Sequence, residues 1–479
     1  MPSSRTYVSN GWTLFGLLAL YFAAHLAARV FASDALELDE AEQVLWTQQL
    51  AAGYGAQPPL YTWLQWTFFQ IIGVSVPALA LLKNLLLATT YTCTWLAARR
   101  LVAPPLAVLA AAGMLLIPQI GWESQRDLTH SVLVTCLASA SLYVVVRLLD
   151  EGPRPALYIA LGLLAGLGML SKYSYAVFAA ALALAVLLRR DARAVWLNPW
   201  LIASGVVALL VFLPHGLWLI DHWQAASART LEKLNTGGGA VAGGPLRGLT
   251  SLAGAIAATV AGLYLILALV FGRTAFRRDA SSPWPRFWRH YLIGLALFML
   301  AMVFIGGATH FKGRWLQPLL FVAPLMFFSS RPHLADSPRL GWLRGVLVVF
   351  GLLYLSLAAG RPLLDGWRDR PDELNEPALE LATALRAAGY DGHLPIVTDT
   401  PVFGGVLRLR FPDAPVTVWK AGAPAPLLPE GPRLVIGRGA VAGDLLERSG
   451  VGEGTRLALS YRHVRPDLPP VEYRYVLVR

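Results

Sequence analysis

Long apolar segments constrain this chain more than any other sequence feature. A membrane-spanning helix needs about 20 predominantly apolar residues, and only 14% of the residues are charged, against roughly 25% in soluble domains. The chain is therefore mostly embedded in a membrane. Eleven segments are candidate spans: roughly 11–31, 76–98, 104–120, 128–149, 156–170, 173–188, 196–219, 247–272, 290–308, 315–330 and 341–360. We interpret the first as a retained helix rather than a signal peptide.

The arginines between these segments predict the orientation of the chain, because cytoplasmic loops of membrane proteins are enriched in Lys and Arg. With the N-terminus in the cytoplasm, every cytoplasmic loop carries arginine, whereas residues 32–75 hold five acidic residues and no Lys or Arg. The alternation predicts an extracytoplasmic C-terminus. A single long helix over 156–188 would invert everything downstream. Because the basic residues act as orientation signals, the net charge of +11 does not indicate a nucleic-acid partner.

The composition changes after Arg361, where the chain becomes polar and rich in proline. Short runs typical of strands (LPIVTD, PVTVW, RLVIG and YRYVLVR) alternate with a helical pattern, ALELATALRAAG. These features predict a small soluble α/β domain. We therefore expect a helical transmembrane domain over 1–360, with interfacial helices in 32–75, and an extracytoplasmic α/β domain over 361–479.

Four outer segments hold nearly all the unusual polar residues. They are LDEAEQ (38–43) with the following QPPLYTWLQ, then GWESQRDLTH (121–130), LSKYSYAVF (170–178) and GATHFKGRWLQP (307–318). Paired carboxylates suit base catalysis or a divalent cation, and Lys and Arg suit a phosphate group. Because all four segments map to one membrane face, together they predict a site for a phosphate-bearing substrate at the membrane surface.

Each of these residues also has a structural interpretation. Glu37 and Glu42 suit an outer loop that simply excludes cations, and Asp127 suits the cap of the helix that follows it. Lys172 can reach the interface from within an apolar run. Lys312 and Arg314 can contact lipid headgroups. His215 and His222, at the end of one span, are interpreted as structural or interfacial.

The order of these motifs resembles the polytopic glycosyltransferases of the GT-C fold that use lipid-phosphate sugars, in particular the protein O-mannosyltransferase and lipid A aminoarabinose transferase group. The matching stretches are LDEAEQ with QPPLYTWLQ, RDLTHSVLVT, GLLAGLGMLSKYSYAVF and HFKGRWLQPLLFVAPL, which run from residue 38 to about 325. The resemblance covers about two thirds of the chain. It implies a polyprenyl-phosphate-sugar donor and catalysis on the outer face of the bacterial inner membrane.

Residue roles follow from the same resemblance. It implies that Asp39, with Glu40 beside it, is the catalytic acidic residue and that Asp127 is the second acidic position. Asp39 and Asp127 are also the candidate ligands if a divalent metal is used. The remaining assignments are three donor-phosphate cations, Lys172, Lys312 and Arg314, and three substrate-binding residues, Gln57, Tyr61 and His310. Many relatives have Lys where this chain has Gln57, so Arg126 is a candidate replacement cation.

The sequence thus predicts an inverting glycosyltransferase that moves a sugar from a polyprenyl-phosphate donor to a lipid, glycan or protein acceptor of the cell envelope. A transporter or flippase of lipid-linked sugars is the alternative. It would place polar groups near the bilayer midplane, often within inverted repeats, and the sequence has no such repeat. A non-catalytic envelope assembly protein is a third interpretation. It would not require the carboxylates and cations to converge.

Overall fold

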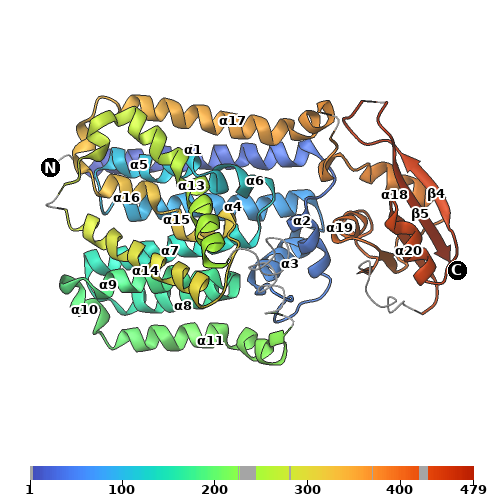
Figure 1. Ribbon diagram of the computed structural model, residues 1–479, viewed down its shortest axis with the longest axis horizontal. Helices are drawn as coiled ribbons and strands as arrows, with labels where there is room; N and C mark the ends of the chain where they lie inside the picture. The colour runs from blue at the N-terminus through green and yellow to red at the C-terminus, as the bar shows by residue number, and fades with distance from the viewer. Residues whose placement is uncertain are drawn as a thin grey trace. The chain divides into compact units, whose positions relative to one another are not determined.

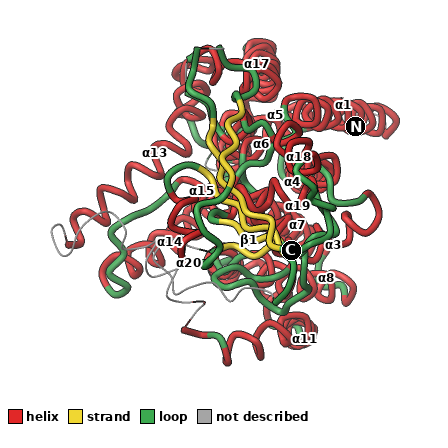
Figure 2. Tube along the Cα trace, turned by 90° about the vertical axis from the view of Figure 1, so that its right-hand side faces the viewer, coloured by secondary structure: helices red, strands yellow, loops and turns green. Residues whose placement is uncertain are grey.

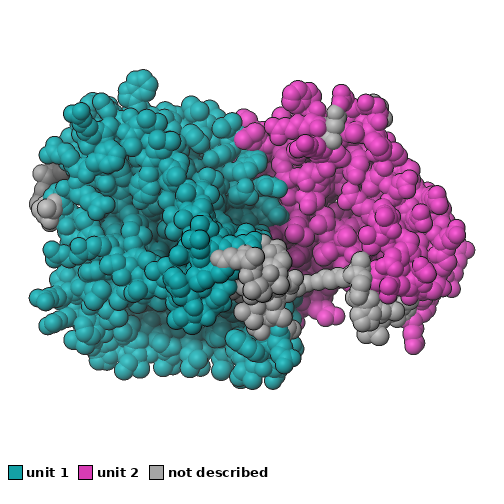
Figure 3. Space-filling model, in the orientation of Figure 1, with its two compact units in different colours: residues 1–23, 51–61, 83–354 teal, residues 24–50, 62–82, 355–479 magenta. Residues whose placement is uncertain are grey.

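The computed structural model describes residues 4–224, 226, 244–279, 282–368, 370–419, 430–465 and 467–479. The chain divides into two compact units (Figure 3). The first contains residues 1–23, 51–61 and 83–354, and the second contains residues 24–50, 62–82 and 355–479.

Seven helices in the described residues are long and apolar enough to cross a membrane. Each of them covers most of one predicted span, and all seven are labelled in Figure 1. As elements, these helices are α1 (Ser4–Ala32), α4 (Val76–Ala98), α7 (His130–Glu151), α11 (Trp200–Asp221), α13 (Gly244–Phe271), α14 (Trp284–Phe304) and α17 (Leu340–Trp367). The chain is therefore a multi-pass membrane protein.

The four remaining predicted spans correspond to helices that are short or broken. The segment 104–120 becomes α5 (Pro104–Ala112) and η1 (Gly113–Leu116), followed after Pro118 by the π-helix η2 (Gln119–Glu123) and α6 (Ser124–Arg126). The two halves are bent by 77°, and they make an eighth span if they are counted as one. The segments 156–170 and 173–188 are α8 (Pro155–Ser171) and α9 (Ser174–Leu187), and 315–330 is divided between α15 (Gly313–Leu320) and α16 (Ala323–Ser329).

The first unit is held together by close contacts between helices. A Cβ atom added to Gly162 on α8 would lie 2.4 Å from the Ser204 carbonyl oxygen on α11, and one added to Gly166 would lie 2.6 Å from Val211 Cβ. Small residues let membrane helices approach closely. In lipid the hydrophobic effect does not drive helices together, so their close van der Waals packing stabilises the association instead. Lys172 has extended backbone angles, which separates α8 from α9. The segment 156–188 is thus two helices, as predicted.

The second unit contains a five-stranded mixed sheet with the order β2-β1-β3-β5-β4. The strands are drawn in yellow in Figure 2. Strand β1 is parallel to both β2 and β3, whereas β5 is antiparallel to β3 and β4. The strands are β1 (Ile396–Thr398), β2 (Val416–Val418), β3 (Arg433–Arg438), β4 (Thr455–Leu459) and β5 (Val471–Val478), and the helices are α18 (Ala378–Ala387), α19 (Pro401–Arg410) and α20 (Val441–Arg448). The small α/β domain predicted after Arg361 is present.

The second unit also includes the acidic segment near the N-terminus. Helix α2 (Leu38–Trp46) contains LDEAEQ, and α3 (Leu60–Ile72) follows QPP. Ala41 and Val44 of α2 belong to one buried apolar cluster with Val406 of α19, and Leu45 belongs to the core of the sheet. The acidic segment is therefore packed on the α/β domain, although the domain boundary at residue 360 itself stays a prediction.

The short helices complete the description. They are η3 (Arg190–Ala192), α10 (Arg193–Trp196), η4 (Gly272–Phe276), η5 (Pro332–Asp336) and η6 (Glu373–Asn375).

Candidate functional site

The two neighbouring carboxylates of LDEAEQ have different surroundings. Glu40 is buried, and its carboxylate accepts hydrogen bonds from Arg29 Nη2 at 2.6 Å and Arg29 Nε at 3.1 Å. It also accepts from the Glu37 backbone N–H at 3.2 Å, which forms half of a capping box at the start of α2. Asp39 is half-buried in the first turn of the same helix. The structure thus gives Glu40 a structural task and leaves Asp39 partly accessible.

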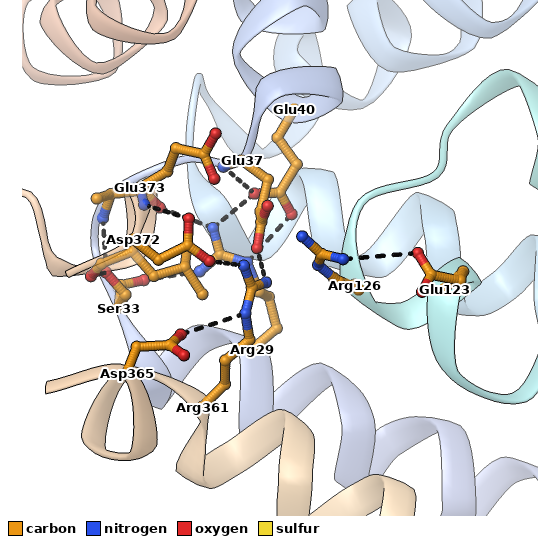
Figure 4. Close-up of polar contacts among 12 residues, drawn as sticks. Arg29, Ser33, Glu37, Glu40, Glu123, Arg126, Arg361, Asp365, Asp372 and Glu373 are labelled. Carbon is orange, nitrogen blue, oxygen red and sulfur yellow. Dashed lines mark hydrogen bonds and ion pairs between the residues drawn. The ribbon is translucent and has the colours of Figure 1, made fainter. Parts of the chain in front are cut away.

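A cluster of ion pairs surrounds Arg361, near the end of α17 (Figure 4). The Arg361 guanidinium pairs with Glu37, which is only 2% exposed, and with Asp372, and it lies 3.6 Å from Asp365. Ser33 Oγ donates to the Leu374 carbonyl oxygen at 2.6 Å. These contacts join the segment before α2 to the segment after α17, both of which belong to the second unit.

Three carboxylates of this cluster lie close enough together to hold a metal ion. Oxygen atoms of Glu37, Asp372 and Glu373 are all within 4.8 Å of one another. However, Arg361 already supplies the positive charge to Glu37 and Asp372. Burial and the neighbouring Asp372 raise the pKa of Glu373 to about 7, whereas the pKa of Asp372 is lowered despite burial, by its hydrogen bond with Glu373 and by Arg361. Hard cations prefer ionised oxygen ligands. Glu373 holds its proton up to about pH 7, and Arg361 already compensates the charges of the other two carboxylates, so the three residues fit a divalent cation poorly.

A polar contact network in the first unit brings two predicted residues together. Lys172 Nζ donates to Ser131 Oγ at 2.8 Å, and the neighbouring His130 has Nδ1 3.3 Å from the Ser171 carbonyl oxygen. The ring of Tyr61, which is 1% exposed, packs on the His130 ring with centroids 5.5 Å apart. The start of α3, the start of α7 and the turn between α8 and α9 therefore meet at this point.

The loop that carries Gln57 is fixed in the same unit by α11. His215 is fully buried, and its Nδ1 lies 2.6 Å from the Ala52 carbonyl oxygen while its Nε2 lies 2.9 Å from Tyr173 Oη. A carbonyl oxygen can only accept a hydrogen bond, so His215 Nδ1 carries the proton and donates the hydrogen bond to Ala52. In the neutral imidazole, Nε2 then accepts from the Tyr173 hydroxyl. Gln57 closes the loop through paired backbone hydrogen bonds with Tyr54, at 3.0 and 3.2 Å. His215 is thus the structural residue that the sequence suggested.

The loop before α7 carries the second acidic position. Asp127 follows α6 and is half-buried, but Thr129, not Asp127, occupies the N-cap position of α7. Arg126 is exposed and lies 3.8 Å from Glu123. An exposed ion pair of this length contributes little free energy to the fold. Breaking the contact with Glu123 would therefore cost little if Arg126 bound a phosphate instead.

The late basic motif begins α15. Lys312 is its N-cap residue and Arg314 lies in its first turn, both half-buried. Gln317 Nε2, on the same helix, donates to Ser124 Oγ at 3.0 Å, so the motif lies beside the loop that carries Arg126 and Asp127. The His310 ring contacts Trp315 edge-on with centroids 6.5 Å apart.

The predicted site residues are therefore distributed over both units. Asp39 and Glu40 belong to the second unit, whereas Gln57, Tyr61, Arg126, Asp127, Lys172, His310, Lys312 and Arg314 belong to the first. Their union in one active site stays a prediction. Sequence reasoning did not identify the partners of Asp34, which are Arg410 and Arg462, or the partner of Glu37, which is Arg361. These arginines lie more than 300 residues away, and no local signal could have found them.

Comparison with known proteins gives concordant results. The family model for dolichyl-phosphate-mannose-protein mannosyltransferase matches residues 56–218. The lipopolysaccharide core galacturonosyltransferase RgtB of Rhizobium johnstonii is 37% identical over 84% of this chain and 82% of its own length. RgtA, named as the same type of enzyme in the same organism, is 35% identical over 88% of this chain and 86% of its own length.

A solved structure supports the fold. The structure of ArnT from Cupriavidus metallidurans bound to undecaprenyl phosphate superposes with a TM-score of 0.64, covering 99% of this chain and 98% of that one. Sequence identity is 13%, so this likeness concerns the fold alone. The predicted GT-C fold, with its small C-terminal domain, is confirmed.

Proposed function

Because the chain belongs to the family of membrane glycosyltransferases that includes the lipopolysaccharide core galacturonosyltransferases, we propose that it transfers galacturonic acid from a polyprenyl-phosphate donor to a sugar of lipopolysaccharide. The chain is a GT-C glycosyltransferase that uses lipid-phosphate sugars. The observation that carries the finer proposal is the 37% identity with RgtB, because it extends over 84% of the chain.

Asp39 is the proposed catalytic base. A general base must come within hydrogen-bond reach of the proton that it removes, and Asp39 is partly accessible on the first turn of α2. It would take the proton of the acceptor hydroxyl, whose oxygen forms a bond to the anomeric carbon while the bond from that carbon to the phosphate oxygen breaks. Attack opposite the leaving group inverts the anomeric configuration.

The leaving lipid phosphate carries the developing negative charge, and cations that bind it lower the barrier. The proposed contacts are Lys172, Lys312, Arg314 and Arg126. Lys172 is supported by its place between α8 and α9, where its ammonium group donates to Ser131 Oγ at the start of α7. Arg126 is supported by its weak, exposed pairing with Glu123. Asp127, on the same loop, is proposed to orient the acceptor.

The proposed location is the bacterial inner membrane, with the N-terminus in the cytoplasm and the C-terminal domain in the periplasm. The names of the relatives support this, because their acceptor is lipopolysaccharide, and so does the alternation of arginine-bearing loops. Cysteine accessibility labelling of single-cysteine variants at exposed positions of the C-terminal domain would check the orientation.

A transfer assay tests the proposal. Purified protein receives radiolabelled polyprenyl-phosphate donors that carry galacturonic acid, mannose, galactose or aminoarabinose, with lipopolysaccharide core or lipid A as acceptor. We expect transfer of galacturonic acid and its loss in Asp39→Asn, while Glu42→Gln, on the same helix, serves as the matched control. Transfer of another sugar would refute the donor assignment, and full activity of Asp39→Asn would refute the assignment of the base.

The proposed reaction does not include a divalent metal. The carboxylates around Arg361 fit a cation poorly, so no step above passes through a metal. The assay in excess chelator, with Mg²⁺ or Mn²⁺ added back, decides whether one is required.

A further inference from the structure

Helix α2, which carries the proposed base, is pressed against helix α19 of the C-terminal domain. A Cβ atom added to Gly405 would lie 2.5 Å from Ala41 Cβ and 2.6 Å from Ala41 Cα. Ala41 is fully buried, and it stands two residues after Asp39. Only glycine at position 405 permits this approach, so the contact with α19 fixes how closely α2 packs on the C-terminal domain.

The chain just before α2 is held by two arginines of the same domain. Arg410, the last residue of α19, pairs with the Asp34 carboxylate and donates to the Asp34 carbonyl oxygen at 2.9 Å. Arg462 Nη1 lies 2.5 Å from the other carboxylate oxygen of Asp34. Two guanidinium groups therefore share one carboxylate five residues before Asp39, and pairs of this kind impose a defined geometry.

The chain just after α2 is held in the same way. Arg408 is buried, and its Nη1 donates to Thr47 Oγ1 at 3.0 Å. The Gln48 side-chain amide donates to the Val416 carbonyl oxygen at 3.1 Å and accepts from the Val416 N–H at 2.7 Å. Gln48 thus satisfies both backbone groups of the first residue of β2, as a neighbouring strand would.

We propose that the C-terminal domain is a positioning element for catalysis, which holds α2 from before, beside and after Asp39. This inference rests on the proposed function, because it takes Asp39 as the base. Arg410, Arg462 and Gly405 are its positioning residues. They act through α2 and are not proposed to contact the substrate. The domain sequence alone carried no recognisable signature, and this role explains its presence on the chain.

These contacts matter for the reaction because the rate is very sensitive to the position of the catalytic base, even in a protein that remains folded. A displacement of about 1 Å by a remote change can cost about 100-fold in rate. Release of Asp34 or a wedge at Gly405 would move α2 while the helices of the first unit remain folded. Substrate binding by other parts of the chain would persist, so the loss should fall on kcat rather than on KM.

The test compares Gly405→Val, Arg410→Ala and the double variant Arg410→Ala/Arg462→Ala with Arg448→Ala. Arg448 is the matched control, because it lies on α20 of the same domain and pairs only with the exposed Asp444 among described carboxylates. We expect kcat for transfer to fall about 10-fold or more in the first three variants. KM for the donor and the yield of monodisperse protein should stay near wild type, and Arg448→Ala should retain full activity.

Two further variants separate positioning from general destabilisation. Asp34→Asn should lower kcat at least as much as Arg410→Ala does, and adding Arg410→Ala to it should lower kcat little further, because Asp34→Asn already removes the ion pair with Arg410. Arg410→Lys should recover part of the lost kcat. Wild-type kcat in the Gly405 and Asp34 variants, or losses that merely follow the fraction of folded protein, would overturn the inference. If the wild type transfers no sugar, or if Asp39→Asn remains active, the proposed function fails first and the inference with it.

Discussion

Replacement of Arg361 by methionine should destabilise the protein strongly. The methionine keeps much of the side-chain volume but removes the charge that pairs with Glu37 and Asp372. Glu37 has a side-chain exposure of only 2%, whereas that of Asp372 is 27%, so water can compensate Asp372 but not Glu37. Loss of one partner of a buried ion pair costs about 3–5 kcal/mol. This is a large part of a typical net stability of about 5–15 kcal/mol.

The assay is thermal unfolding of purified protein in one detergent at fixed pH. Arg368→Met, at an exposed arginine just past the end of α17, is the matched control and should unfold like the wild type. The double variant Arg361→Met/Glu37→Gln should recover much of the loss, because no buried charge is left without a partner. An Arg361→Met protein that melts like its control, or a double variant that is less stable than both single variants, would show that the cluster does not stabilise the fold.

Three further outcomes follow from the structure. Lys172→Ala should raise KM for the donor or lower kcat, while Lys172→Arg should retain activity if the role is phosphate binding; steady-state kinetics with varied donor checks this. The pKa of Glu373 is raised from 4.5 to about 7 in the folded state, so the folded protein binds a proton there more tightly than the unfolded chain does. The stabilisation that comes from this proton is complete below about pH 4.5 and is lost as the pH rises through about 7. Unfolding of Glu373→Gln across that range should therefore show its stability relative to wild type increasing with pH. A Cβ atom at Gly53 would lie 2.4 Å from the Trp218 ring, so Gly53→Ala should lower the melting temperature, and a wild-type value would show that the loop adjusts.

The membrane helices were predictable because their signal is local. A span needs only a sufficient run of apolar residues, and the limits of α4 (Val76–Ala98) coincide with the predicted segment 76–98. Breaks within spans were less predictable. Pro118 stands at the 77° bend, but whether a proline ends, kinks or continues a helix depends on which neighbours satisfy the freed backbone groups.

The sheet shows the same limit. Strands β1 and β2 lie within predicted β-type runs, and β3 and β5 overlap such runs but extend one or two residues beyond them, whereas β4 (Thr455–Leu459) was not predicted. It is an edge strand of TRLAL with several exposed residues, so it lacks the apolar run that marks the central β3. Its pairing with β5 follows from the completed sheet and not from its own composition.

Asp39 and Glu40 show why the candidate site was only partly predictable. In sequence they are one acidic pair, and both were assigned to catalysis. Consecutive residues of a helix point in directions about 100° apart, so one helix turn sends them to different environments. Glu40 turns inward to Arg29 and stabilises the start of α2, whereas Asp39 stays half-buried. The direction of that turn is set by Ala41 against Gly405 and by the arginines that hold Asp34. Residues of the C-terminal domain, far away in sequence, thus hold the helix on which Asp39 stays half-buried while Glu40 is fully buried.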